Sequence, residues 1–244
     1  MLTETRQEEI LKIVNSEKSI TVQKLKELLD ASESTIRRDI TALDKEGKLV
    51  RVFGGAVSIN ATASKDDKEK VNTAEKTGIA RVAAELIWAG DYVFLDSGTT
   101  TGYMIDYLRE KNATYVTNSI SHARRLAERD FRVFLIGGEV RAANDSIIGA
   151  DAVLHIQKYH FTKGFFGTNG ISMNAYFTTT DVREALIKRV AIGNTMSGSR
   201  YILADHTKFG EMSAVTFSEF AGTVVLTDKK PDEIYLRSME IRVV

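Results

Sequence analysis

Two adjacent arginines, Arg37 and Arg38, lie near the start of this sequence beside the hydroxyl residues Ser34 and Thr35. A guanidinium group can donate two parallel hydrogen bonds to a guanine edge or to a phosphate, and short hydroxyl side chains also bond to phosphate oxygens. In a helix these polar side chains share an exposed face, because apolar residues recur at helical spacing on another face. The apolar residues are Ile36, Ile40 and Leu43. The pattern predicts a helix that enters a DNA groove.

Three helices are expected to position these side chains. Apolar residues at helical spacing predict a first amphipathic helix around residues 10–14. Thr21 can cap a second helix, whose apolar residues lie between 22 and 29. After a short turn, Ser32 can cap the third helix, which carries the arginines. The order of these elements is that of a helix-turn-helix unit.

A hairpin is predicted directly after the third helix. Gly47 is expected to end that helix, and residues 48–52 and 56–59 have the pattern of two short strands. They are joined through Phe53-Gly54-Gly55, and Arg51 lies on the first strand, where it is expected to contact the phosphate backbone. Helices and hairpin together predict a winged helix-turn-helix domain.

Charge does not distinguish this interpretation from a small helical domain whose arginines are merely solvated. Residues 1–60 hold ten Lys and Arg and ten Asp and Glu, so the segment is not basic as a whole. Attraction to DNA must therefore be local to the third helix and the wing. One such helix reads few base pairs, so we expect a symmetric oligomer, a homodimer or a homotetramer, that presents a second helix to a second half-site.

The same residues resemble the DNA-binding domain of the DeoR family of bacterial sugar-operon regulators. The resemblance rests on Thr35-Ile36-Arg37-Arg38-Asp39 followed by Gly47, Arg51 and Gly54-Gly55-Ala56. It implies that operator DNA is a partner and that Ser34, Thr35, Arg37, Arg38 and Arg51 contact it. The family usually has a histidine just before the wing glycines, where this sequence has Phe53.

The composition indicates a two-domain protein without a metal or cofactor. The 244 residues are 43% hydrophobic and 27% charged, as in globular proteins, and large apolar residues are scarce between Asn60 and Glu75. We therefore expect a DNA-binding domain at 1–59, a linker at 60–75 and a second domain at 76–244. The absence of cysteine, and of an H-x-x-x-H spacing among the four histidines, argues against disulfides and metal sites. No apolar run predicts a signal peptide or a membrane span, so a cytoplasmic location without a membrane partner is expected.

The second domain alternates short apolar runs with helical patterns. The runs predicted as strands are residues 92–95, 115–117, 133–136, 164–166, 201–204 and 224–227. Such alternation is typical of α/β domains whose largely parallel sheet is covered by helices on both faces. The overall fold class predicted is thus α/β, with an N-terminal winged helix-turn-helix.

Small and polar residues follow five of these runs. The segments are residues 96–101, 118–119, 137–138, 167–170 and 205–208. Ligands bind at the carboxyl ends of strands in open α/β sheets. A helix starting near Gly102 would present free backbone N–H groups beside three threonine hydroxyls, which suits a phosphate. Each segment alone is equally explained as a turn or a helix cap, and the ligand site is predicted from the five together.

This half resembles the C-terminal sensor domain of the DeoR family. Matching motifs include Asp96-x-Gly98-Thr99-Thr100, Gly137-Gly138, Thr178-Thr179 and Asp205-x-x-Lys208-Phe209-Gly210. The resemblance implies a fold similar to ribose-5-phosphate isomerase that binds a phosphorylated sugar as inducer. Within the family the pattern is most like that of fructose operon repressors, which makes fructose 1-phosphate the expected effector. A glycine common before the threonine pair is Tyr176 here, a change expected to reshape the pocket floor.

The expected ligand contacts divide into two groups. The phosphate is placed on Gly98, Thr99, Thr100 and Thr101, with Lys208 as the cation. The sugar hydroxyls are placed near Asp96, Asn118, Gly138 and Asn169. Threonine hydroxyls and helix amides supply the donors for a phosphate, and carboxylate or amide side chains suit sugar hydroxyls.

Two other functions fit parts of the sequence. An isomerase-like enzyme is the first, because Glu184 lies where the isomerase carries its catalytic glutamate. Residues 166–169, however, lack the acidic groups of that enzyme, and residues 171–182 contain no lysine, so catalysis is not expected. The second is an architectural DNA binder whose second domain serves only for assembly. The predicted function is a transcriptional repressor of a sugar operon, released from its operator by a phosphorylated sugar.

Overall fold

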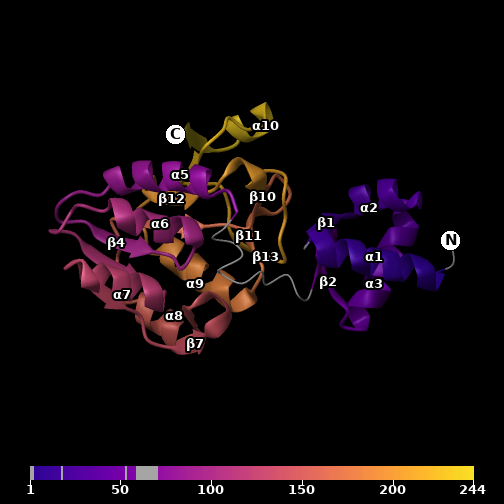
Figure 1. The fold of residues 1–244 in the computed structure, drawn as a ribbon, viewed down its shortest axis with the longest axis horizontal. Coiled ribbons are helices and arrows are strands. Elements are labelled where there is room, and N and C mark those ends of the chain that lie inside the picture. Colours follow the sequence, from indigo (N-terminus) through magenta and orange to yellow (C-terminus); the bar gives the residue numbers. More distant parts are fainter. Residues whose placement is uncertain (1–2, 18, 53, 59–70) are drawn as a thin grey trace.

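The computed structural model describes residues 3–17, 19–52, 54–58 and 71–244 of the chain, in two parts (Figure 1). We call residues 3–58 the head and residues 71–244 the α/β domain. The wing-tip Phe53 and most of the predicted linker lie outside the described residues. None of the helices within the described ranges has the length and hydropathy needed to cross a membrane.

The head contains the predicted helices and hairpin. Its elements are α1 (Thr3–Glu17), β1 (Ser19–Thr21), α2 (Val22–Leu29), α3 (Glu33–Lys45), β2 (Leu49–Val52) and β3 (Gly55–Ser58). The predicted caps are confirmed: the Thr21 hydroxyl accepts from the N–H of Lys24 at 3.1 Å, and the Ser32 hydroxyl accepts from the N–H of Thr35 at 3.3 Å. Gly47 follows α3 with a left-handed φ of 68°, as expected for a residue just after a helix end.

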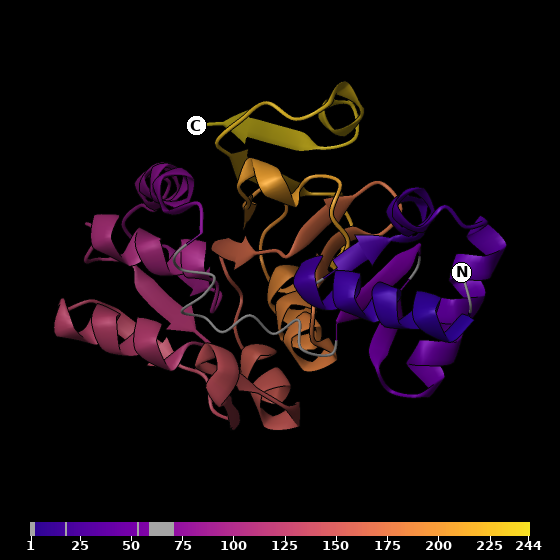
Figure 2. The ribbon, with the colours of Figure 1, turned by 45° about the vertical axis from the view of Figure 1, so that its right-hand side comes forward.

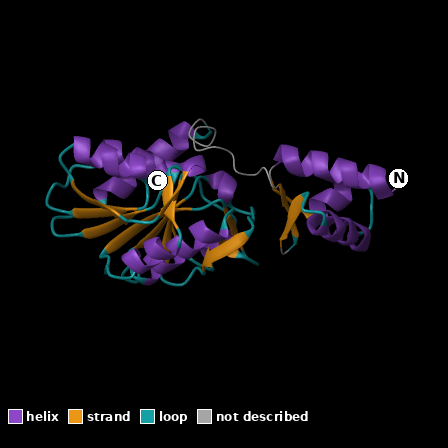
Figure 3. Cartoon of the chain, turned by 90° about the horizontal axis from the view of Figure 1, so that it is seen from below, coloured by secondary structure: helices purple, strands orange, loops and turns teal. Residues whose placement is uncertain are grey.

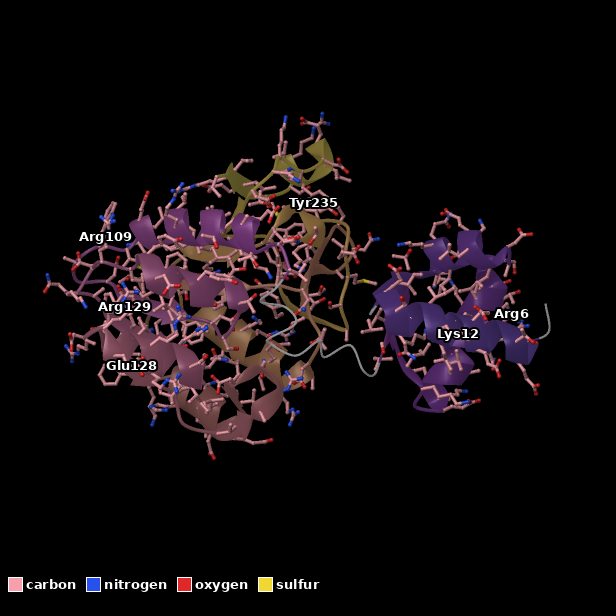
Figure 4. All side chains as sticks on the ribbon, in the orientation of Figure 1. Arg6, Lys12, Arg109, Glu128, Arg129 and Tyr235 are labelled. Atoms are coloured by element: carbon pink, nitrogen blue, oxygen red, sulfur yellow. The ribbon has the colours of Figure 1, made fainter. Side chains whose placement is uncertain are left out.

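Strand β1 was not predicted, and it completes an antiparallel sheet of order β1-β3-β2. The close approach of the strands explains Gly55, because a Cβ there would lie 2.2 Å from the carbonyl oxygen of Ile20. On the other side of the head, α1 is held to α3 by a charged pair. Arg6 lies on α1 (Figure 4), and its Nε is 2.6 Å from a carboxylate oxygen of the buried Asp39. Asp39, which is part of the DeoR-like motif described above, therefore fixes α3 against α1.

The α/β domain is built on a seven-stranded parallel sheet of order β15-β14-β12-β9-β4-β5-β6. The strands are β4 (Tyr92–Leu95), β5 (Thr114–Thr117), β6 (Arg132–Leu135), β9 (Lys163–Gly167), β12 (Arg200–Leu203), β14 (Thr223–Thr227) and β15 (Glu240–Val243). All six predicted strands are confirmed, with ends shifted by one residue at most. The seventh, β15, was missed because its alternating charges, Glu240 and Arg242, hide a short edge strand.

Helices cover both faces of the sheet (Figure 3). One face packs against α5 (Thr73–Glu85), α6 (Thr99–Tyr107) and α7 (Ile120–Glu128), and the other against α8 (Ala150–Ile156) and α9 (Val182–Gly193). Alternate strand residues divide between the two cores: Val93 and Leu95 face the first, and Phe94 faces the second. A short helix, α10 (Glu233–Leu236), precedes the last strand. Helix α5 begins at Thr73, within the segment predicted as linker.

Two small antiparallel sheets complete the domain. One has the order β10-β11-β13 and the other pairs β7 with β8. Their strands are β7 (Glu139–Arg141), β8 (Ser146–Ile148), β10 (Gly170–Ser172), β11 (Tyr176–Thr179) and β13 (Val215–Ser218). Tyr176 has a left-handed φ of 58°, a backbone conformation that glycine adopts more readily than tyrosine. Its ring packs edge-on against Phe220, at a centroid distance of 5.1 Å.

Candidate functional site

The exposed face of α3 carries the four residues predicted to enter DNA. Ser34, Arg37 and Arg38 are exposed and Thr35 is half-buried, while the apolar face of the helix is buried in the head. The hydroxyl of Ser32 lies 2.9 Å from that of Ser34 and 2.8 Å from that of Thr35. These hydroxyls form a hydrogen-bonded cluster at the start of the helix, where backbone N–H groups favour phosphate oxygens.

The two arginines differ in their surroundings. Arg37 donates to a carboxylate oxygen of Glu33, one turn earlier, at 2.6 and 2.9 Å. Arg38 has no hydrogen-bond or ion-pair partner among the described residues, so its guanidinium is available to a ligand without breaking any contact. Arg51 is also exposed, and its backbone N–H donates to Asp44 at 2.8 Å, which ties the wing to the end of α3.

The head lies beside the part of the α/β domain that carries the small sheet of β10, β11 and β13 (Figure 2). A groove of about 280 Å³ separates them. Glu33, Arg37 and Gly54 line it from the head, and Gly210 and Met212 are among the residues that line it from the other side. The groove is therefore distinct from the predicted strand-end site.

The strand-end site begins with the N-terminus of α6. This helix starts at Thr99, with Gly98 as its N-cap, so the predicted start near Gly102 was wrong. The reason is that glycine at the cap lets the turn close immediately after the strand, and the threonines then form the first helical turn. No side chain caps α6. The N–H groups of its first turn thus remain available to an anion.

The threonines of this turn play different structural roles. Thr99 is half-buried, whereas Thr100 and Thr101 are buried. The Thr101 hydroxyl lies 2.6 Å from the carbonyl oxygen of Asp96 and 2.7 Å from that of Gly98, so it fastens the loop to the helix. Among the three hydroxyls, that of Thr99 is the most accessible to a ligand.

Asp96 lies at the centre of the site. Its side chain is fully buried, and one carboxylate oxygen accepts from the backbone N–H of Gly167 at 3.0 Å and pairs with Lys188. The other carboxylate oxygen, Oδ1, has no hydrogen-bond partner among the residues that the structure describes. A buried carboxylate oxygen without a donor is energetically costly, so it marks a position where a ligand donor would be stabilised.

Lys188 was not among the predicted ligand contacts. Its Nζ donates to the carbonyl oxygen of Gly167 at 3.0 Å and lies 3.6 Å from a carboxylate oxygen of Glu184. Burial alone would lower the pKa of Lys188, but the charges of Asp96 and Glu184 raise that pKa above its ordinary value. The sequence did contain a signal, because Lys188 falls on the apolar stripe of α9 and a lysine there needs a carboxylate partner.

The charged network continues outward from Glu184 to residues that the sequence analysis did not single out. Arg141, at the end of β7, lies 3.4 Å from Glu184 and 3.5 Å from Asp181. Asp181 is also the N-cap of α9 and accepts from the backbone N–H groups of Arg183 and Glu184. Burial favours a higher pKa for Asp181, but these N–H groups and the Arg141 charge bring the pKa below its ordinary value.

The other predicted ligand residues lie on neighbouring strand ends. Asn118 follows β5 and is fully buried. Its amide donates to Ser97 at 3.4 Å, and within the described ranges of the chain its Oδ1 has no hydrogen-bond partner. Asn169 follows β9 and accepts from the Thr179 hydroxyl at 3.1 Å. Gly138 follows β6 with a φ of 145°. The sheet order brings Asn118 and Asn169 to either side of β4, and Gly138 lies one strand further out.

The segment after β12 carries Lys208 and also meets the start of α5. Lys208 lies close enough to Asp205 to lower its pKa, although burial acts in the opposite direction. Asn72, which directly precedes α5, donates through its side-chain amide to Asp205 at 3.0 Å and to the Thr207 hydroxyl at 3.4 Å. Asn72, near the start of the described part of the α/β domain, is therefore hydrogen-bonded to the edge of the candidate ligand site.

Both parts of the chain match known domain families. The family model described as DeoR-like helix-turn-helix domain matches residues 6–62, and the one described as DeoR C terminal sensor domain matches residues 71–229. The chain belongs to the DeoR family of transcriptional regulators.

Curated relatives agree along nearly the whole length. An uncharacterized HTH-type transcriptional regulator, FruR, of Bacillus subtilis is 40% identical over 93% of this chain and 92% of its own. The lactose phosphotransferase system repressor of Streptococcus mutans is 34% identical over 96% of this chain and 95% of its own. The family and these relatives make the protein a transcriptional regulator and not an enzyme.

Among solved structures, ribose 5-phosphate isomerase A from Neisseria gonorrhoeae aligns with a TM-score of 0.40 at 14% identity. The alignment covers 55% of this chain and 52% of the isomerase. In the regulator, the glutamate considered above as a catalytic base, Glu184, is paired with Lys188 and Arg141.

Proposed function

We propose that this regulator represses a sugar-utilisation operon and leaves its operator when a phosphorylated sugar binds the α/β domain. The observation that carries the proposal is the uncapped first turn of α6 beside the unpartnered Oδ1 of Asp96. Donors for a phosphate and an acceptor for a hydroxyl thus lie within one loop. The names of relatives support repression, and fructose 1-phosphate is the first effector to test because FruR is among them.

On the DNA side, α3 enters the major groove with Ser34, Thr35, Arg37 and Arg38, and Arg51 contacts the backbone from the wing. Arg38 carries no competing contact, whereas Arg37 is oriented by Glu33. Arginine forks read guanine, and the cluster of hydroxyls at the helix start fixes the register on the phosphates. Two copies, in a homodimer or homotetramer, supply the two half-sites.

On the effector side, the phosphate binds the N–H groups of Gly98, Thr99 and Thr100 and is balanced by Lys208. The sugar hydroxyls then face Asp96 and Asn118, with Gly138 and Asn169 at the edge. The Thr101 hydroxyl holds the loop, so Thr101 contributes mainly through its backbone.

The effector must also favour one arrangement of the two heads over the other, because a ligand with equal affinity for both shifts nothing. Fluorescence anisotropy on the protein bound to a labelled operator measures this directly. Fructose 1-phosphate should release the wild-type protein, and Thr99→Ala and Lys208→Ala should bind the operator but resist release.

Full release of both variants would place the phosphate elsewhere. If no sugar phosphate affects the wild-type complex, the effector hypothesis is wrong, and the α/β domain serves assembly alone. Sedimentation of the full chain tests the oligomer separately, because a monomer at micromolar concentration would contradict the two-half-site model.

A further inference from the structure

The groove between the head and the α/β domain contains part of the surface predicted to read DNA (Figure 2). Glu33 and Arg37 of α3 line it, and so does Gly54 of the wing. The residues across the groove include Ser172, Asn174, Gly210 and Met212. Its volume of about 280 Å³ is below the roughly 300–1,000 Å³ of a site for one small ligand. A DNA duplex therefore cannot reach Arg37 in this arrangement.

Met212 reaches the wing from the α/β domain. A Cβ added at Gly54 would lie 3.7 Å from the terminal methyl group of Met212. The carbonyl oxygen of Gly54 accepts from the backbone N–H of Val22 at 2.7 Å, which ties the wing to the start of α2. Met212 thus lies against the head where the wing meets α2. A methionine side chain is unbranched and adapts to irregular surfaces, which suits a contact that forms and breaks.

The segment that carries Met212 is fixed to the small sheet of β10, β11 and β13. On one side of Met212, the backbone N–H of Gly210 donates to the carbonyl oxygen of Ile171 at 2.9 Å. On the other side, the backbone N–H of Ser213 donates to the Thr178 hydroxyl at 2.9 Å. Because hydrogen bonds hold the backbone on both sides, Met212 has a defined position above the sheet and is not part of a loose loop.

We propose that the α/β domain holds the head in an arrangement that cannot bind DNA, with Met212 as the anchor against the wing. The inference rests on the proposed function, because it takes α3 as the helix that contacts DNA. Docked and free heads are in equilibrium, so docking lowers the measured affinity for DNA in proportion to the fraction of heads that are docked. Lys208 and Met212 belong to one segment, which joins the candidate ligand site to the anchor.

A covalent bridge across the groove tests the blocked arrangement. Gln23 and Asn174 are exposed and line opposite sides of the groove, and neither is a predicted DNA contact. The chain has no cysteine, so a short bis-maleimide reacts only with the two thiols of the full-length Gln23→Cys/Asn174→Cys variant. Fluorescence anisotropy with a labelled random-sequence duplex at low salt measures binding through the same basic side chains. The bridged protein should bind at least about tenfold more weakly than the untreated variant.

Two controls separate the bridge from the chemistry used to make it. The same variant treated with N-ethylmaleimide carries an adduct on each thiol but no bridge, and it should bind DNA like the untreated protein. Lys12→Cys/Asn174→Cys moves one thiol to an exposed position on α1, which is not among the groove residues (Figure 4). Bis-maleimide should leave the DNA affinity of this second variant unchanged.

Met212→Ala tests the anchor in the opposite direction. It shortens the side chain that meets the wing and adds no charge, so fewer heads are docked. Its affinity for the duplex should rise about two- to fivefold. Met196→Ala is the matched control, because Met196 is 61% exposed and lies between α9 and β12, outside the groove residues. It should bind DNA like the wild-type protein.

The outcomes separate the inference from the function on which it rests. Undiminished DNA binding by the bridged protein overturns the blocked arrangement, and wild-type affinity in Met212→Ala overturns the anchor. Both results leave the proposed function intact. If Arg38→Ala binds the duplex as tightly as the wild-type protein, α3 is not the DNA-contacting helix, and the inference fails together with the DNA side of the proposed function. No sugar phosphate enters these measurements, so a failed effector hypothesis does not alter them.

Discussion

The head and the α/β domain use positive charge in opposite ways. In the head, Arg38 and Arg51 are exposed and their guanidinium groups have no ion-pair partner in the described chain. In the α/β domain, Lys188 and Arg141 are buried and each is held by two carboxylates. DNA is an external polyanion whose counterions are released on binding, so a free exposed cation is useful. A buried cation must instead be neutralised by carboxylates of the protein itself. Lys188 and Arg141 therefore serve mainly to hold the residues of the candidate ligand site in place, and less to attract an anion.

The largest effect is expected from removing the buried cation. Lys188→Met leaves Asp96 charged and buried without its partner, which should cost the α/β domain about 3–5 kcal/mol in the free energy of unfolding. Urea unfolding followed by circular dichroism measures this. The double variant with Asp96→Asn should recover much of the loss, because no uncompensated charge remains.

The matched control for this change lies in the head. Lys12 is exposed on α1 (Figure 4) and pairs with Glu9, which is also exposed, at 2.7 Å. Lys12→Met should leave the unfolding midpoint unchanged, since exposed ion pairs contribute little. A similar loss in both lysine variants would remove the contrast between the two regions.

The next largest effects are expected at the exposed arginines. Arg38→Ala should cost about 1–3 kcal/mol in operator affinity and relax specificity at one base position, if Arg38 reads a base. Arg51→Ala should instead weaken all sequences alike and lower the salt slope by about one per head, as expected for a phosphate contact. Anisotropy titrations at several salt concentrations against operator and random DNA distinguish the two. Wild-type affinity in both variants would contradict the DNA-binding assignment.

A smaller effect is expected where the two regions meet. Asn72 links the start of α5 to Asp205 and Thr207. Asn72→Ala should preserve operator binding and effector binding measured separately, but reduce the coupling between them by about 0.5–2 kcal/mol. The measurement is operator affinity with and without saturating fructose 1-phosphate. Unchanged coupling would mean that the signal leaves the site by another route.

The smallest effect is expected from acid. The pKa values of Asp181 and Asp205 lie below the ordinary 3.8, because N–H donors and neighbouring cations outweigh burial. Stability from a lowered pKa is complete above the unfolded-state value and is lost as the pH falls through the folded-state value. The free energy of unfolding, measured by urea titration, should therefore stay constant from pH 7 to about 5. Below pH about 4 it should fall by less than about 1.4 kcal/mol per pH unit for each group. Asp205→Asn should flatten this fall, and an equally steep fall in that variant would contradict its origin.

The elements predicted most accurately are those with strong local signals. Thr21 and Ser32 cap their helices as predicted, because capping depends on a few adjacent residues. The apolar runs predicted six of the seven strands of the main sheet. Helix α6 was placed three residues too late, since a run of three threonines reads equally well as a loop or as a first turn.

The parts of the site that could not be predicted depend on contacts between distant segments. Arg141 gives no sign in the sequence that it meets Asp181 and Glu184, because β7 belongs to a small sheet that was not predicted. In the sequence Asn72 lies in a segment predicted as a polar linker, and only the fold brings it to Asp205.

The pairing of Asp96 with Lys188 also sets an order for folding. These partners are 92 residues apart in the chain, whereas Arg6 and Asp39, which hold α1 to α3, are 33 apart. Contacts between nearby residues form faster, and domains generally fold in the order of their synthesis. The head is therefore expected to fold while the ribosome is still adding the segment that completes the candidate ligand site. A chain cut short before α9 is expected to carry a folded head together with an incomplete candidate ligand site.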